Sequence, residues 1–468
     1  GLSMNANQNS IPRELVYDVD AMLGNRLMKV RFPFIGADVP EGHQGQSVEG
    51  MSHGAVLAKL KDGFHRRRLP WGFNADHQPI GGVFDAREEA LVRGSLLATS
   101  ITFDLSPELM ATTLKEGDGS GITTRLATIP VDLVKTVEKR LAEIGLRPSP
   151  IERDRLLATV WPAMQKMQRR DRLYTEARAK AFSTEIGRKF LRELSIDELP
   201  GLTSPETLAI MLALAEAMGM PAHFVAPAFG FQKNFPFDDQ AELERRISGA
   251  WAVCRHFGVS IGFHSGSGKS ADNYRCCGRI TGGRLEIKTS GRYTYEMGVA
   301  LSQSPQQVDR TLWQDWYGFT RELAISSAFS ADATERSMAR TFVEHALRRD
   351  GKPVDVFADP ARCRAALQSL DPSPDHMFFF EYNFLFVLAG GGAADKARLG
   401  DHGPDGYRQR ARFYAISDQA KLAYTRRVAE YLIFLAETTG LASPATCASA
   451  RTRLASYCCL RALSSDIG

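Results

Sequence analysis

The chain has 468 residues, of which 44% are hydrophobic and 24% are charged, a composition typical of globular proteins with a large buried core. This composition excludes disordered and fibrous proteins. The formal net charge is only +4, and the basic residues are scattered among acidic ones, so we expect no nucleic-acid partner.

The cysteines and the apolar segments indicate where the protein works. Seven cysteines, with vicinal pairs at 276–277 and 458–459, lack the spacing of a disulfide framework and are typical of a reducing compartment. The most apolar run, Met377 to Leu388, is well short of the ~20 residues that a membrane helix needs. Gly1-Leu2-Ser3 does not resemble a targeting signal. We therefore expect a cytoplasmic protein with a small-molecule substrate and no membrane partner, and homo-oligomerisation is compatible with the sequence.

Short β-rich segments that end in a polar residue or glycine recur along the chain. They are Leu27–Phe34, Trp71–His77, Thr99–Asp104, Leu191–Glu198, Ala222–Gly230, Val259–Gly266, Arg284–Gly291 and Met377–Asn383. Between several of them lie segments of helical periodicity, such as Glu206 to Met218 and Asp239 to Phe257. This alternation predicts a parallel sheet with crossover helices, and eight candidate strands are the number that a closed barrel requires.

Further helical segments interrupt and follow the predicted barrel. Ile129 to Glu193 is rich in Arg, Lys, Glu and Leu with helical periodicity, and predicts an inserted pair or trio of helices at about 129–190. The tail from Asp405 has the same character. The sequence therefore predicts an α/β fold of the (β/α)8 TIM-barrel type, with a catalytic domain at 1–400 and a C-terminal helical extension, 401–468, packed on the barrel.

Two histidines lie where a barrel places its reactive groups, at the C-terminal ends of strands. His77 and His264 each close a predicted strand, beside carboxylates or glycines. Imidazole and carboxylate ligands, with positions left for substrate oxygens, suit Zn, Mn or a similar divalent ion. The sequence therefore predicts a metal site at these histidines, where the ion acts as a Lewis acid.

Structural roles are an alternative for the same residues. A single histidine in a strand is more often a core or surface group than a ligand. Asp104 precedes Ser106-Pro107-Glu108 and suits the cap of the next helix. Asp197 and Glu198 are adjacent and point to opposite faces of a strand, so at most one of them faces the barrel axis. The sequence does not say which.

The glycine-rich segment 262–270 resembles a phosphate-binding loop but lacks its spacing, because the position of the required first glycine is Phe263 and Gly262 lies one residue too early. Its glycines predict a turn in which backbone N–H groups approach an anionic ligand, with Lys269 as a point charge. We interpret it as a substrate-binding loop that includes Ser265 and Ser267.

Several blocks, in order, resemble the tagaturonate (fructuronate) epimerases of bacterial hexuronate catabolism. They lie between Gln46 and Glu296, and consist of residues 72–77, 102–104 and 194–198, followed by His264-Ser265-Gly266-Ser267 with Lys269, Thr281-Gly282-Gly283 and Ile287-Lys288-Thr289. The resemblance implies a (β/α)8-like barrel, a divalent metal, and an open-chain keto-uronic acid that is inverted at one carbinol. Because that carbon lies β to the ketone, the reaction implied is retro-aldol cleavage with re-closure from the other face.

The resemblance also implies roles for single residues. His77 and His264 are similar to metal ligands, and Glu198 or Asp197 to an acid/base group, with Glu49 as a second candidate. The residues similar to substrate-binding groups are Lys269, Lys288, Ser265, Ser267 and Asp104.

The chain departs from the family pattern at several positions. Gln232 stands where a glutamate ligand is expected, which makes it a candidate uncharged ligand. Gly50-Met51-Ser52-His53 replaces a stretch rich in arginine and threonine, and Gly268 replaces an aspartate. Two other functions therefore stay open. One is a sugar-acid binding protein that has kept the barrel and lost catalysis, and the other is a phosphate- or nucleotide-binding protein that uses residues 266–270.

Overall fold

The computed structural model describes residues 4–7, 67–68, 71–114, 117–197, 201–232, 235–388, 409, 412–413 and 415–467. These residues fall into two compact units. The first is formed within Gly1–Gln8, Leu69–Thr289 and Leu435–Ser443, and the second within Asn9–Arg68, Ser290–Phe434 and Pro444–Gly468. The predicted division at residue 400 stays a prediction. Among the helices in the described ranges, none combines the length and the apolar character needed to cross a membrane.

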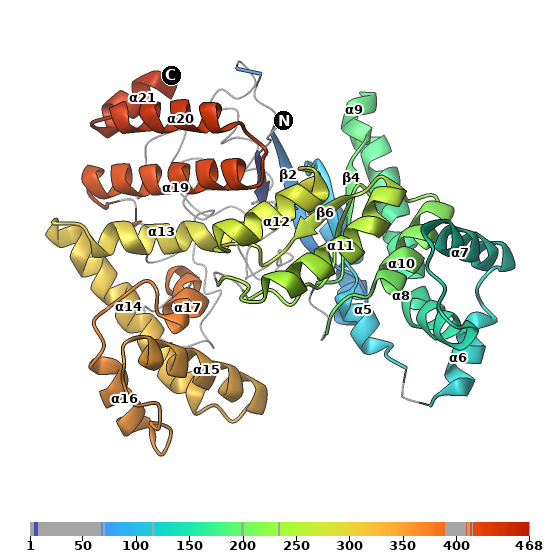
Figure 1. The fold of residues 1–468 in the computed structure, drawn as a ribbon, viewed down its shortest axis with the longest axis horizontal. Helices are drawn as coiled ribbons and strands as arrows, with labels where there is room; N and C mark the ends of the chain where they lie inside the picture. Colours follow the sequence, from blue (N-terminus) through green and yellow to red (C-terminus); the bar gives the residue numbers. More distant parts are fainter. Residues whose placement is uncertain are drawn as a thin grey trace. The chain divides into compact units, whose positions relative to one another are not determined.

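The first unit is built on a parallel sheet of seven strands that follow one another in sequence order (Figure 1). Each strand pairs in parallel with the next. All C-terminal strand ends therefore lie along one edge of the sheet. The strands are β1 (Met4–Asn7), β2 (Trp71–Pro79), β3 (Ser100–Asp104), β4 (Leu191–Ser195), β5 (Phe224–Ala226), β6 (Ser260–Phe263) and β7 (Leu285–Ile287).

The strands from β2 to β7 confirm six of the eight predicted segments. The strand predicted at Met377–Asn383 is wrong, because these residues begin the helix α17 (Met377–Leu388). An apolar run that is buried on all sides has no periodicity that separates strand from helix. The candidate Leu27–Phe34 lies outside the described residues, and β1 has no counterpart among the predictions. Within the described ranges, the strands form a mixed α/β fold with an open parallel sheet, and no eighth strand completes a barrel.

Local sequence signals explain where the helices of the first unit begin and end. Ser204 caps α10 and Pro205 fills its first turn. Asp239 caps α11, and Gly258 ends it with a φ of 69° that favours glycine. These helices match the two segments predicted from periodicity. The helices are η2 (Gly82–Arg87), α4 (Glu88–Gly94), α5 (Ser106–Ala111), α6 (Gly119–Leu126), α7 (Val131–Ile144), α8 (Pro150–Ala181), α9 (Glu185–Arg188), α10 (Pro205–Ala217), α11 (Gln240–Phe257) and α12 (Ala271–Thr281).

The helices α7 to α9 occupy the segment predicted as a helical insertion. Helix α8 is the longest of them, with 32 residues, and packs against α4, α5, α6 and α10. Its buried side chains include Arg170, Asp171 and Arg178 as well as apolar residues. Arg170 donates to the carbonyl of Pro79, the last residue of β2, and Arg178 donates to that of Ala98, just before β3, so polar contacts hold the helix against the sheet.

The second unit is helical in its described part. Aromatic side chains form its core, with Trp316 against Phe379, Phe386 and Phe413. Helices predicted for the tail beyond Asp405 are present as the last three elements. The helices that lie wholly or largely in this unit are α13 (Ser290–Ser302), α14 (Gln307–Ala328), α15 (Ala333–Arg349), α16 (Pro360–Gln368), α17, α19 (Asp418–Thr438), α20 (Pro444–Ser456) and α21 (Leu460–Ile467).

Candidate active site

Polar side chains alternate with apolar ones along the strands of the parallel sheet. On β4 and just beyond it, Glu193, Ser195 and Asp197 alternate with the buried Leu194 and Ile196. Residues two apart on a strand share a face, so these polar groups point the same way. The same spacing holds for Asn74 and Asp76 on β2, Thr102 and Asp104 on β3, Gly262 and His264 at β6, and Glu286 and Lys288 at β7.

His264 lies at the centre of this polar face. Its Nε2 is 2.9 Å from Glu193 Oε1 and 3.7 Å from Glu286 Oε1, and its Nδ1 is 3.0 Å from Asp197 Oδ1. Ser195 holds the last carboxylate, because its hydroxyl donates to Asp197 Oδ1 over 2.6 Å. Gly262 leaves room for this arrangement, since a Cβ there would lie 2.9 Å from Glu193 Oε1.

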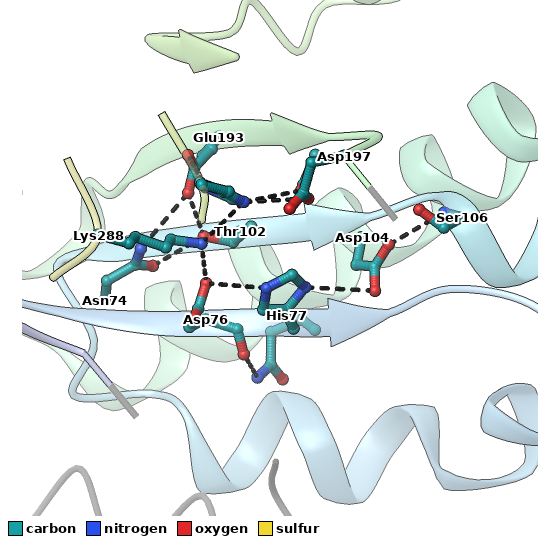
Figure 2. A network of polar contacts seen from close by, with 12 residues as sticks. Asn74, Asp76, His77, Thr102, Asp104, Ser106, Glu193, Asp197 and Lys288 are labelled. Carbon is teal, nitrogen blue, oxygen red and sulfur yellow. Dashed lines mark hydrogen bonds and ion pairs between the residues drawn. The ribbon is translucent and has the colours of Figure 1, made fainter. Parts of the chain in front are cut away.

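Lys288 connects His264 with the β2 side of the site. Its Nζ donates to Asp76 Oδ1 and lies 3.1 Å from His264 Nδ1. His77 follows Asp76 and has its Nδ1 3.5 Å from Asp104 Oδ2 (Figure 2). The rings of His77 and His264 lie with their centroids 5.6 Å apart.

A layer of neutral side chains supports Glu193. The Thr102 hydroxyl donates to Glu193 Oε2, and Asn74 Nδ2 lies 3.4 Å from the same oxygen (Figure 2). Glu193, Thr102 and Asn74 are all buried. A buried carboxylate that is hydrogen-bonded in this way keeps a fixed position, which is what an orienting group needs.

The buried charges shift one another's pKa values. Burial alone would raise the pKa of Glu193, but Lys288 and His264 outweigh it and lower the pKa to about 2. Burial opposes the charged form of Asp76 and of Asp197 too, and neighbouring cations still hold both pKa values well below their usual range. Burial and the charge of Glu193 raise the pKa of Glu286.

The two imidazoles and the lysine shift in the complementary direction. Burial and Lys288 oppose a charge on His264, but Asp197 and Glu193 raise its pKa well above the usual value. Asp76 raises the pKa of His77 against burial, and also that of Lys288. Titratable groups that perturb one another this strongly cluster at functional sites.

Backbone strain occurs at both histidine positions. The register of β2 with β3 shifts between Ala75 and Gln78, and within this bulge His77 has a φ of 44°. Ser265, directly after His264, has a φ of 54°. A left-handed backbone costs a non-glycine residue roughly 1–2 kcal/mol, and bulges and strain of this kind concentrate near active sites.

Two groups of side chains in the described part of the chain have the composition and spacing of a metal site. One consists of His77, Asp197 and His264, and the other of Glu193, His264 and Glu286. Within each group the ligand atoms lie within 4.8 Å of one another. Imidazole and carboxylate donors are those of Zn and Mn sites.

Comparison with known proteins identifies the family of the chain. The family model of UxaE, tagaturonate epimerase, matches residues 45–323, which is more than half of the chain. The chain belongs to the tagaturonate epimerase family. No curated protein matches it.

Solved structures of a tagaturonate epimerase relative share the fold. The native fructuronate-tagaturonate epimerase UxaE from Cohnella laeviribosi aligns over 94% of this chain and 81% of that chain, with a TM-score of 0.56 and 16% identity. Its complex with one glycerol aligns over 92% and 78%, with a TM-score of 0.53 and 15% identity. Together with the family match, this likeness supports an epimerase of uronate sugars.

The structure brings five of the residues predicted for the tagaturonate epimerase site into one cluster. These are His77, His264, Asp197, Lys288 and Asp104. Asp104 Oδ1 also accepts the N–H of Ser106, the first residue of α5, although the cap position of that helix is Leu105 and not Asp104. Of the adjacent pair Asp197 and Glu198, the first lies in the cluster. Glu198 and Glu49 lie outside the described residues.

The glycine-rich loop after β6 is held by its lysine. Lys269 is buried, and its Nζ donates to the carbonyls of Gln232 (2.6 Å), Phe235 (2.6 Å) and Ser267 (3.3 Å). Burial lowers the pKa of Lys269 to about 7. Ser265 is half-buried and Gln232 is exposed. The hydrogen bonds of Lys269 connect the loop after β6 with the loop after β5. Substrate contact by the loop after β6 and metal binding by Gln232 stay predictions.

Sequence reasoning missed Glu193 and Glu286 as members of the site, and it gave no individual role to Asp76, Asn74 and Thr102, although they lie in the strand ends that it selected. These residues can be found by looking for polar residues at every second position along a whole strand. The sequence analysis looked only at the residues that end each strand. Four strands of one sheet carry polar residues at period two, and β6 presents Gly262 and His264 at the same spacing.

Proposed function

We propose that this chain is a divalent-metal-dependent epimerase that inverts one carbinol of an open-chain keto-uronic acid by retro-aldol cleavage and aldol re-closure. The single observation that carries the proposal is the buried cluster of two imidazoles among carboxylates. Five carboxyl groups accompany the imidazoles there: Asp76, Glu193, Asp197 and Glu286, which also act on Lys288, and Asp104, which lies beside His77. We further propose that the open sheet belongs to a (β/α)8-like barrel, which its consecutive parallel order supports.

The donor set fits a divalent ion. Imidazole nitrogens and carboxylate oxygens are the donors that Zn and Mn accept, and a divalent ion would take over from the imidazoles the positive charge that now faces the carboxylates. His77 and His264 would hold the ion, and Gln232 is the candidate third ligand at the family's carboxylate position. A bound divalent ion supplies Lewis acidity, which acidifies a substrate hydroxyl and stabilises negative charge on an enediolate.

The chain's own residues supply the remaining steps. Asp197, or Glu198 beside it, takes the proton from the hydroxyl of the carbon to be inverted. The bond from that carbon to its neighbour, the carbon α to the ketone, then breaks, and leaves an aldehyde and an enediolate. After the aldehyde has turned its other face, the bond re-forms, and the carboxylic acid returns the proton to the new alkoxide. Asp197 suits this exchange because the Ser195 hydroxyl fixes it and its side chain is 14% exposed.

Lys288 is the cation placed to bind substrate oxygens. Its pKa is raised by Asp76 and Glu193, so the ammonium keeps its charge in this buried position. A fixed positive charge beside the reacting atoms stabilises developing negative charge without reorganisation. Lys269, by contrast, directs its three N–H groups to backbone carbonyls, which argues against a phosphate-binding function for the loop after β6.

The test combines metal analysis with turnover. Protein purified without chelators is analysed for bound metals, loaded with Mn²⁺ or Zn²⁺, and incubated in D₂O with a panel of keto-uronates and plain ketoses. NMR then follows epimer formation. We expect inversion of a keto-uronate without deuterium at the inverted carbon, because cleavage and re-closure do not exchange that C–H.

Two results would contradict the proposal in different ways. Deuterium at the inverted carbon would indicate proton transfer at carbon in place of bond cleavage. No conversion of any panel member by the metal-loaded protein, together with saturable binding of a keto-uronate, would identify a sugar-acid binding protein.

A further inference from the structure

The segment of β2 that carries Asp76 and His77 is bulged, and buried polar groups outside the cluster hold it. Gln78, the residue after the bulge, is completely buried. Its Nε2 donates to the Asp76 carbonyl oxygen over 3.4 Å. The Gln78 side chain thus binds the backbone of Asp76, two residues earlier, and this hydrogen bond spans His77, the residue with positive φ.

Helix α8 provides the partner that orients this amide. The Tyr174 hydroxyl donates to Gln78 Oε1 over 3.3 Å, and its oxygen lies 2.7 Å from Ser95 Oγ. With its oxygen facing the hydroxyl, the amide must present its NH₂ group to the Asp76 carbonyl. Burial raises the pKa of Tyr174 to about 12, so the phenol remains a donor at every physiological pH.

A second contact from α8 holds the other end of the bulge. Arg170 is completely buried, and its Nη2 lies 3.4 Å from the Pro79 carbonyl oxygen, to which it donates. Its Nε donates to Glu88 Oε1 over 3.0 Å, so the guanidinium itself is fixed. Two consecutive residues after His77 are therefore bound to side chains one helical turn apart, Arg170 and Tyr174.

We propose that Gln78 and Tyr174 are positioning residues of the active site, which hold the bulged segment so that His77 faces His264. The effect of these residues on catalysis rests on the proposed function. Their effect on the position of the His77 ring does not, because it can be measured in the metal-free protein. A strained backbone conformation persists only where surrounding contacts hold it in place. Here these contacts are the hydrogen bonds to the carbonyls of Asp76 and Pro79, on either side of His77.

The chemistry of the two side chains supports a specific role over general core packing. A core position on a strand next to an apolar helix is normally filled by Leu, Ile or Val, which need no partner. Here a glutamine and a tyrosine are buried together, and each depends on the other for a hydrogen bond. Groups hydrogen-bonded directly to a metal-binding histidine typically change metal affinity about 10–100-fold when they are removed, and groups that hold the backbone of such a histidine should act in the same direction.

The experiment compares Tyr174→Phe and Gln78→Met with a control on the same helix, Arg178→Met. Arg178 is also buried, and its guanidinium donates to four backbone carbonyls, of Leu96, Ala98, Gly187 and Lys189, none of them in the bulge. Histidine-labelled, metal-free protein gives the imidazole NMR resonance of His77, which is assigned by its loss in His77→Gln. Titration with Co²⁺ then gives the metal affinity and the visible spectrum.

We expect both test variants to move the His77 resonance and to weaken Co²⁺ binding about tenfold or more. The control should lower the melting temperature while leaving the His77 resonance and the Co²⁺ spectrum unchanged. An unmoved His77 resonance in folded Tyr174→Phe and Gln78→Met would overturn the inference. If the unmodified protein binds no Co²⁺, the proposed metal dependence fails, and the His77 resonance still decides the positioning role by itself.

Discussion

His264 Nε2 lies 2.9 Å from Glu193 Oε1, and both side chains are almost completely buried. A carboxylate that accepts the Nε2 hydrogen fixes the tautomer of the ring and leaves the Nδ1 lone pair for a ligand. That nitrogen faces Asp197 and Lys288. The pairing therefore favours Nδ1 as the metal-binding nitrogen of His264, on the side of the ring that faces away from Glu193.

The first prediction concerns metal content. We expect one divalent ion per chain, lost in His77→Ala and in His264→Ala, because each variant removes one of the two imidazole ligands of the proposed site. His256→Ala is the matched control, since His256 is a partly exposed residue of α11 that pairs with Glu143. Elemental analysis of the purified variants checks the result. Full metal content in either site variant would return that histidine to a structural role.

Glu193→Gln tests the orienting role of the carboxylate. The amide keeps the size of the side chain but donates as well as accepts, so it no longer selects one tautomer of His264. We expect metal affinity to fall about 10–100-fold, without the complete loss seen on removal of a ligand. Calorimetric titration with Zn²⁺ measures it. Complete loss of binding would instead make Glu193 a direct ligand, as in the second candidate group.

The sequence could predict the parallel sheet and the two histidines, because both follow from local signals. Strands that alternate with helical segments form a parallel sheet, in which all C-terminal strand ends lie along one edge. His77 and His264 are the imidazoles at that edge of the sheet. Glu193 and Glu286 lie inside strands, where a carboxylate is normally excluded, and only the pairing of β4, β5, β6 and β7 brings them to His264. Lys269 shows the reverse. It lies in a segment that resembles a phosphate-binding loop, but its ammonium group binds backbone carbonyls, which no sequence pattern predicts.

The next prediction is that the hydrogen bonds of Lys269 hold the loop that follows β5 against the loop that follows β6. Lys269→Met removes the hydrogen bonds to the carbonyls of Gln232 and Phe235, and each such bond contributes about 0.5–1.5 kcal/mol. We expect proteolytic cleavage near residues 231–237 to become about tenfold faster or more, because local opening becomes easier. Lys189→Met, on an exposed side chain, is the control. Equal cleavage rates would contradict the tie.

A pH dependence of stability should come from the second unit. His376 is buried, its Nδ1 accepts from the Tyr317 hydroxyl over 2.6 Å, and its Nε2 lies 3.1 Å from Asp350 Oδ2. Burial lowers the pKa of His376 below 6.5. As pH falls through 6.5, the unfolded chain therefore takes up this proton before the native protein does, and the free energy of unfolding decreases.

Comparison with His376→Phe isolates this contribution. Between pH 8 and pH 5, we expect the melting temperature of the unmodified protein to fall more steeply than that of the variant. Other histidines with a lowered pKa, such as His223 and His345, contribute equally to both proteins. Parallel curves would show that His376 keeps the same proton affinity in the folded and unfolded chain.

The last prediction concerns Asp197, which is both a candidate acid/base group and a neighbour of the candidate ligands. Asp197→Asn keeps the shape of the side chain and its contact with the Ser195 hydroxyl, but cannot take a proton from a substrate hydroxyl. We expect turnover of the keto-uronate to fall about a hundredfold or more, since general base catalysis contributes about 10²–10⁴ in rate.

Metal content separates the two roles of Asp197. If the carboxylate transfers the proton, Asp197→Asn retains one ion per chain and binds substrate with little change while turnover falls. Loss of the ion from the variant would place Asp197 among the ligands with His77 and His264, and would leave proton transfer to Glu198. Unchanged turnover with the ion retained would remove Asp197 from the mechanism. Lys139→Met, on an exposed side chain of α7, serves as the activity control because its ion pair with Glu143 lies at the surface, where such pairs contribute little.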